Sequence, residues 1–194
     1  MQRPFFLASI LAMIASPAFA HTGVGTVSGF SAGFGHPIGG LDHVLAMVAV
    51  GILAAQQGGK SMWFVPAAFV GMMLIGGVVG IAGIPLPFVE IGIVGSVVVL
   101  GGVIAFGRQM PMGIAMALVG VLAIFHGHAH GTEMPADASG VQYAIGFILA
   151  TALLHAVGIG LGAGAQKIAE KIAPVLVRIS GGAIAAGGAL LFIA

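Results

Sequence analysis

Two short segments of the chain hold most of the side chains that bind transition metals. Residues 36–43 read His-Pro-Ile-Gly-Gly-Leu-Asp-His and come immediately ahead of a long apolar run. Imidazoles and a carboxylate at the mouth of a membrane helix cost solvation free energy, so their presence there indicates a function. The chain contains no cysteine, which leaves mainly nitrogen and oxygen atoms as ligands. We therefore predict that His36, Asp42 and His43 bind a metal ion.

The helix expected in this segment decides how these three side chains lie. If it starts near His36, with Pro37 in its first turn, His36 and His43 share one face. Asp42 then lies to the side, where it either ligates the ion or holds His43 in one tautomer. In the competing interpretation His36 caps the helix, Asp42 is solvated at the interface and His43 packs in the interior. The sequence leaves both interpretations open.

Residues 125–133, Phe-His-Gly-His-Ala-His-Gly-Thr-Glu, form the second segment. If this segment is helical, His126, His130 and Glu133 form one face and His128 points elsewhere. If it is extended, all three imidazoles share a side. Either geometry brings at least two ligands together, and neutral imidazoles with a carboxylate suit divalent Ni, Cu, Zn and Co. The competing interpretation is a hydrated loop whose histidines are incidental.

His155 differs from the other candidates because it lies deep inside an apolar run, near the middle of the membrane. Thr151 and Gly158 share its helix face. An imidazole that faces small residues there is a candidate transfer site for an ion. A structural histidine, hydrogen-bonded to a neighbouring backbone group, is equally well supported.

Composition identifies an integral membrane protein. Of its 194 residues, 59% are hydrophobic and 6% are charged, whereas a soluble domain carries about 25% charged residues. The net charge of +1 comes without a basic cluster, which excludes nucleic-acid binding as a function class. No phosphate-binding loop, Ser-His-Asp set or pair of carboxylates is visible, so we expect neither an enzyme nor a tightly bound cofactor.

The chain is expected to be all-α, with six transmembrane helices after a cleaved signal peptide. Residues 1–20 combine Arg3, a short apolar run and an Ala-Phe-Ala end, which is typical of such a peptide; an uncleaved first span is the alternative. Residues 21–194 then form a single transmembrane domain, in which residues 22–35 are an interfacial lead-in. Six apolar runs of bilayer length follow, with approximate bounds 37–57, 62–83, 88–106, 111–127, 141–164 and 174–193.

Charge predicts how these spans are oriented, because cytoplasmic loops carry an excess of Lys and Arg. A periplasmic N-terminus of the mature chain places all of its Lys and Arg residues on the cytoplasmic side: Lys60, Arg108, Lys167, Lys171 and Arg178. The same orientation places the two histidine segments on the outer side. We therefore expect the cations and the metal ligands to lie on opposite faces of the membrane.

The two histidine segments together resemble those of the HupE/UreJ family, and the resemblance extends to the signal peptide, the six spans and the length. A separate nickel/cobalt permease family has four residues between the corresponding His and Asp, whereas five separate His36 from Asp42 here. The resemblance implies uptake of nickel, or in some members cobalt, across the bacterial inner membrane for hydrogenase, urease or cobalamin synthesis. It also implies that His36, Asp42 and His43 are the essential residues of the first motif, and His126, His130 and Glu133 those of the second.

The function expected on these grounds is a permease that moves Ni²⁺, or next Co²⁺, from periplasm to cytoplasm. Its partners would be the divalent ion and the lipid bilayer, and a homo-oligomer is left open. Two alternatives remain. One is a membrane-bound accessory protein that binds metal for enzyme maturation without transporting it. The other is a b-type cytochrome with His43 and His155 as axial ligands.

Overall fold

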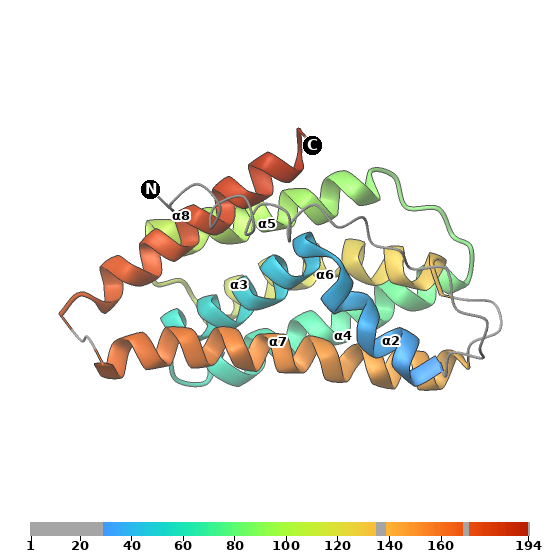
Figure 1. The fold of residues 1–194 in the computed structure, drawn as a ribbon, viewed down its shortest axis with the longest axis horizontal. Helices are drawn as coiled ribbons and strands as arrows, with labels where there is room; N and C mark the ends of the chain where they lie inside the picture. Colours follow the sequence, from blue (N-terminus) through green and yellow to red (C-terminus); the bar gives the residue numbers. More distant parts are fainter. Residues whose placement is uncertain (1–28, 135–138, 169–170, 194) are drawn as a thin grey trace, which may run out of the picture.

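The structure, a computed structural model, describes residues 29–134, 139–168 and 171–193. The predicted signal peptide, residues 1–20, lies outside this part of the chain. The described residues form helices throughout, joined by short turns: α2 (Gly29–Gly39), α3 (Leu41–Gln57), α4 (Ser61–Ile81), α5 (Val89–Phe106), α6 (Met112–Thr132), α7 (Gly140–Ile168) and α8 (Ala173–Leu191). Figure 1 shows α7 running the length of the bundle along its lower edge, with α5 and α8 side by side at the upper edge.

Helices α4 to α8 are each long and apolar enough to cross a bilayer. Helices α2 and α3 meet at 82° and supply a sixth span if the bent pair counts as one. The outward-facing side chains are large and apolar, as lipid contact requires; examples are Trp63, Val78, Phe106 and Ile179. The prediction of an all-α membrane protein is confirmed.

The prediction of one continuous helix over residues 37–57 is wrong. The chain is extended at Gly40, with φ −102° and ψ 125°, and α3 begins only at Leu41. Pro37 lies inside α2 instead of starting a helix. A proline removes one backbone hydrogen bond from a helix, and the Gly39-Gly40 pair that follows has low helix propensity. His36 and His43 consequently belong to different helices and do not share a face.

Helix α2 also corrects the expectation of an interfacial lead-in, because it starts at Gly29. It is held against α7 by two glycines that let the backbones touch: Gly33 lies against the Tyr143 carbonyl and Gly146 against the Phe30 carbonyl. Close backbone approach is the usual source of attraction between membrane helices. This packing outweighs the poor helix propensity of a glycine-rich segment, which is why the sequence did not reveal the helix.

Glycine contacts of the same kind join the other main helix pairs. Gly51 of α3 lies against the His155 backbone of α7, and Gly101 of α5 lies against the Gly181 backbone of α8. Between α4 and α6, Gly76 lies against the carbonyl of Ile124. The high glycine content therefore serves a tightly packed bundle.

The bundle has two chemically different ends. We call the end where α3 starts and α6 finishes the histidine end, because residues 36–43 and 126–133 meet there. The opposite end, where α3 finishes and α8 starts, we call the cationic end. Its turns are tied together by hydrogen bonds from Gln57 Nε2 to the Arg108 carbonyl (3.1 Å) and from Arg178 Nε to the Ala105 carbonyl (2.8 Å).

The glycine contacts predict a position-specific effect on stability. Replacing Gly76 by Ala would drive a methyl group into the Ile124 carbonyl, whereas Gly71 on the same helix has open space around it. Overpacking of this kind costs about 1–3 kcal/mol. Thermal unfolding in detergent should therefore show a lowered Tm for Gly76→Ala and an unchanged or raised Tm for Gly71→Ala. Equal Tm values for the two variants would contradict the packing described here.

Candidate metal centre

The bend at Gly40 carries His36 to the end of α6. His36 Nε2 lies 2.9 Å from Glu133 Oε2, and His130 Nδ1 lies 3.8 Å from the same oxygen. One potential ligand atom from each of the three residues lies within 4.8 Å of the other two. Ligands of a transition metal sit about 2.0–2.2 Å from the ion, so a small adjustment of these side chains would place all three around one ion.

Helix α6 continues to Thr132, five residues beyond the predicted end of its span at residue 127. The second histidine segment is therefore helical, and the hydrated-loop interpretation is wrong. The extra turn forms because Gly127 and Gly131 pack against the α4 backbone at Met73 and Gly77. This contact turns His126 and His130 toward α3, as the helical alternative predicted, and leaves His128 on another face.

Asp42 and His43 form a pair at the start of α3. Asp42 Oδ1 accepts hydrogen bonds from the His43 backbone N–H (2.8 Å) and from His43 Nδ1 (2.9 Å). An ionised carboxylate can only accept, so Nδ1 carries the proton and Nε2 keeps its lone pair. His43 Nε2 is buried and has no hydrogen-bond partner. Asp42 thus holds His43 in the tautomer that a metal ion needs.

A hydrogen bond also fixes the tautomer of His126, with the proton on Nε2 where His43 has it on Nδ1. The Ser96 hydroxyl donates to the Ile93 carbonyl (2.6 Å), and its oxygen lies 2.8 Å from His126 Nε2. Because the hydroxyl proton is already used, His126 Nε2 must donate. The lone pair then lies on Nδ1, which is buried and unpartnered.

The four imidazoles form a row across three helices. Ring centroids are 4.5 Å apart for His36 and His130, 4.3 Å for His130 and His43, and 4.7 Å for His43 and His126. Neither nitrogen of His130 has a hydrogen-bond partner. A buried polar atom without a partner costs about 1–3 kcal/mol. Several such nitrogen atoms lie along the row, and two of its rings are held in a defined tautomer. This arrangement fits a metal ion, which accepts lone pairs from the groups that bind it.

His128 does not join this row. Its Nε2 donates to the Ile84 carbonyl at 2.8 Å and so anchors the turn between α4 and α5. The structure therefore separates His128 from the other two imidazoles of its segment.

His155 lies beyond the row, on α7. The fully buried ring of Phe69 separates it from His126, with centroid distances of 5.7 Å to His126 and 5.3 Å to His155. Both nitrogens of His155 are buried without a partner. The alternative of a histidine bonded to a neighbouring backbone group is therefore wrong. Thr151 donates to the sulfur of Met73 instead of to His155.

Comparison with known proteins agrees with the two motifs. A family model described as HupE / UreJ protein matches residues 9–191. The chain belongs to the HupE/UreJ family. A curated relative, Protein HupE of Rhizobium leguminosarum bv. viciae, is 46% identical over 188 residues, which cover 96% of this chain and 97% of the relative. No solved structure was found to match. The resemblance inferred from the motifs is confirmed.

Three residues of this HupE/UreJ site were not expected from the sequence. Ser96 and Phe69 contact the histidines, and Tyr143 lies beside His36 with a ring-centroid distance of 6.1 Å. Ser96 carried a signal, because a lone hydroxyl in an apolar span needs a partner. Phe69 and Tyr143 carried none, since aromatic residues are common in membrane helices.

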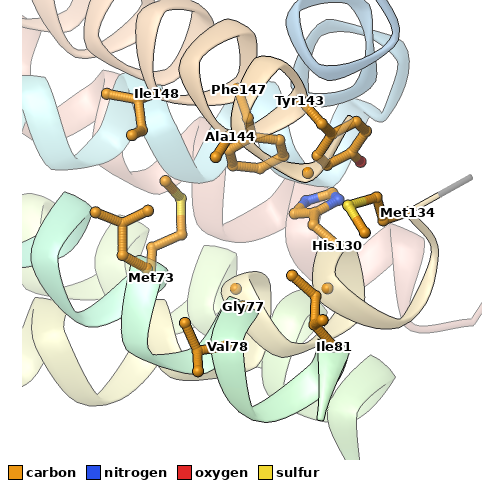
Figure 2. A pocket seen from close by; sticks show the side chains of 14 residues that line it. Met73, Gly77, Val78, Ile81, His130, Met134, Tyr143, Ala144, Phe147 and Ile148 are labelled. Carbon is orange, nitrogen blue, oxygen red and sulfur yellow. The ribbon is translucent and has the colours of Figure 1, made fainter. Parts of the chain in front are cut away.

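A cavity of about 100 Å³ opens beside His130, between α4, α6 and α7. Figure 2 shows the His130 ring lying next to Tyr143 and Met134, with Met73 and Ile148 further along the wall. The walls are mainly apolar, and the buried Tyr143 hydroxyl has no hydrogen-bond partner. His130 therefore has space on one side that its neighbours do not fill.

The geometry of this HupE/UreJ protein predicts that two neighbouring histidines differ in metal binding. His130→Gln should weaken Ni²⁺ binding by about tenfold or more, the range seen when a site loses a ligand or its support. His128→Gln keeps a donor for the Ile84 carbonyl and should bind as the wild type does. Isothermal titration of the purified protein in detergent measures both. Equal losses in the two variants would contradict the separation of His128 from the row.

Proposed function

We propose that this protein is a permease that carries Ni²⁺, and next Co²⁺, inward across the bacterial inner membrane. The observation that supports this most strongly is the change in exposure along the ligand set. The side chains of His36 and Glu133 are 34% and 51% exposed, whereas those of His43 and His130 are 9% and 5% exposed. His155, beyond Phe69, is 2% exposed. Ligands arranged from surface to interior suit passage of an ion.

Capture begins at the exposed pair. His36 Nε2 and Glu133 Oε2 bond to each other at 2.9 Å, and an arriving ion replaces this bond by taking both atoms as ligands. The carboxylate offsets part of the ion's charge. Because the metal ion is hydrated in water, each water that it loses must be replaced by a protein atom of comparable strength.

Movement inward uses the imidazole row. His130 and His43 offer unpaired nitrogens near the capture pair, and His126 offers the next. Neutral imidazoles replace the lost waters, while Asp42, bonded to His43, supplies negative charge close to the row. Phe69 then blocks the direct way to His155, so its ring must move for each ion that passes.

The charges of the protein and of the ion bear on two further points, the orientation of the protein in the membrane and the energy for transport. The positive-inside rule assigns the cationic end to the cytoplasm and the histidine end to the periplasm. A membrane potential supplies about 2.3 kcal/mol per charge per 100 mV, and a divalent ion carries two charges. The potential thus favours inward movement without nucleotide hydrolysis.

The choice of nickel rests on the ligands and on the family. Imidazole and carboxylate suit Ni²⁺ and Co²⁺, and no thiolate is available to prefer softer ions. The family resemblance adds a link to hydrogenase, urease or cobalamin systems. The ring contacts argue against the b-type cytochrome alternative, because the rings of His126 and Phe69 lie between those of His43 and His155.

One observation favours the accessory protein as a second candidate. The fully buried Phe69 ring closes the route between His126 and His155, and a protein that only stores or delivers metal needs no open route. Proteoliposomes separate the two functions. A permease accumulates nickel inside the vesicles, whereas an accessory protein binds nickel without flux.

Nickel uptake into cells tests the proposed site. His43→Gln removes the inner ligand and Asp42→Asn removes the charge that holds it, so each should lower the uptake of radioactive nickel by about tenfold or more. His128→Gln is the matched control and should transport at the wild-type rate. Expression of each variant is checked by immunoblotting. Wild-type uptake by both site variants would refute the proposed site.

A further inference from the structure

The cationic end contains a second polar feature that the histidine row does not explain. A cavity of about 400 Å³ lies there between α3, the turn after α5, and the facing ends of α7 and α8. Its polar lining comes from Gln56, Gln109, Gln166 and Arg178. Three amides from three separate parts of the sequence line this cavity: Gln56 is partly buried, and Gln109 and Gln166 are exposed at its mouth.

The hydrogen bonds of these glutamines determine which amide atom is left to bind other groups. Gln56 Nε2 donates to the Ile104 carbonyl (3.0 Å), Gln109 Nε2 to the Gln56 carbonyl (2.8 Å) and Gln166 Nε2 to the Ala55 carbonyl (3.5 Å). Carbonyl oxygens cannot donate, so each amide must turn its nitrogen to the backbone. The three amide oxygens are left over, and that of Gln56 is buried with no partner.

Oxygens that can only accept suit water molecules bound to a cation. Metal-bound waters are strong donors, because the ion withdraws electron density from them. Six waters occupy roughly 180 Å³ at about 30 Å³ each, so a fully hydrated divalent ion fits the cavity. Amide oxygens hold such an ion far more weakly than imidazoles do. The Arg178 guanidinium at the rim opposes long residence of a cation.

Helix α7 connects this cavity to His155. His155, Gly158, Gly162 and Gln166 follow at spacings that place them on one face. Gly158 lies against the Val48 carbonyl and Gly162 against Ala55, so this face packs on α3. Gln166 lies eleven positions after His155, or roughly 16 Å along the helix axis. The cavity thus lies at the far end of the face that carries the innermost histidine.

We propose that this glutamine-lined cavity is the release site, where an ion that has left His155 regains its waters before it enters the cytoplasm. The proposal rests on the transport function proposed above. Capture at the histidine end then uses strong nitrogen ligands, and release at the cationic end uses weak contacts to the hydration shell. The site would accept a hydrated divalent cation and would not retain it.

The absence of native cysteine allows a direct test with single-cysteine variants. Gln166→Cys is reconstituted in proteoliposomes and treated, from the cationic side only, with a positively charged, membrane-impermeant methanethiosulfonate. Val175→Cys, on the exposed surface of α8, is the matched control. Nickel flux from the histidine side is then measured against nickel concentration.

Modification of Gln166→Cys should lower the maximal rate by about tenfold, since a fixed positive charge in the exit opposes a cation. The KM for nickel should not rise, because capture occurs at the other end. The modified control should transport as before. Unimpaired flux in modified Gln166→Cys, failure of the reagent to reach this cysteine, or a raised KM at an unchanged maximal rate would each overturn the release site. Absence of flux in the wild type would instead overturn the transport function itself.

Discussion

The turn of 82° between α2 and α3 controls where the ligands lie. A continuous helix would carry His36 away along the axis of α3 and leave Glu133 with His130 alone at the end of α6. The break at Gly40 returns His36 to Glu133, while Asp42 and His43 remain at the first turn of α3. The packing of α2 on α7 through Gly33 and Gly146 holds this arrangement in place. The positions of the proposed metal ligands therefore depend on a backbone contact that includes none of them.

Six buried nitrogen atoms on His43, His126, His130 and His155 have no hydrogen-bond partner. Each costs about 1–3 kcal/mol relative to a bonded state, which is a large fraction of the stability of a typical protein. Close glycine packing between the helices supplies part of the compensation. Such a row offers an ion several similar positions, which suits the stepwise passage proposed above.

The sequence was sufficient for the class of protein, the two histidine segments and the separation of charge. These properties depend on composition and on spacing along one helix. It was insufficient for helix α2 and for the extra turn of α6, because each depends on glycines that pack against another helix. The break at Gly40 was missed although Pro37 and the Gly39-Gly40 pair disfavour a continuous helix. The contacts of Ser96, Phe69 and Tyr143 were missed because they form between side chains of different helices. A side chain's partner across the bundle is not encoded in its local pattern.

His128 and His130 show most clearly what the sequence alone left open. Both occur in one short motif, and composition treats them alike, yet one bonds the Ile84 carbonyl and the other keeps two free nitrogens in the row. Helical spacing already separated His128 from His130, but the sequence left open whether the segment is helical or extended. The packing of Gly127 and Gly131 on α4 determined that it is helical and that His130 faces α3.

X-ray absorption at the nickel edge tests the central claim, that the imidazole row holds the ion, most directly. The nickel-loaded protein should show the outer-shell scattering of two or more imidazoles, reduced by one in His130→Gln and unchanged in His128→Gln. A spectrum of nickel surrounded by water oxygens alone would contradict the account.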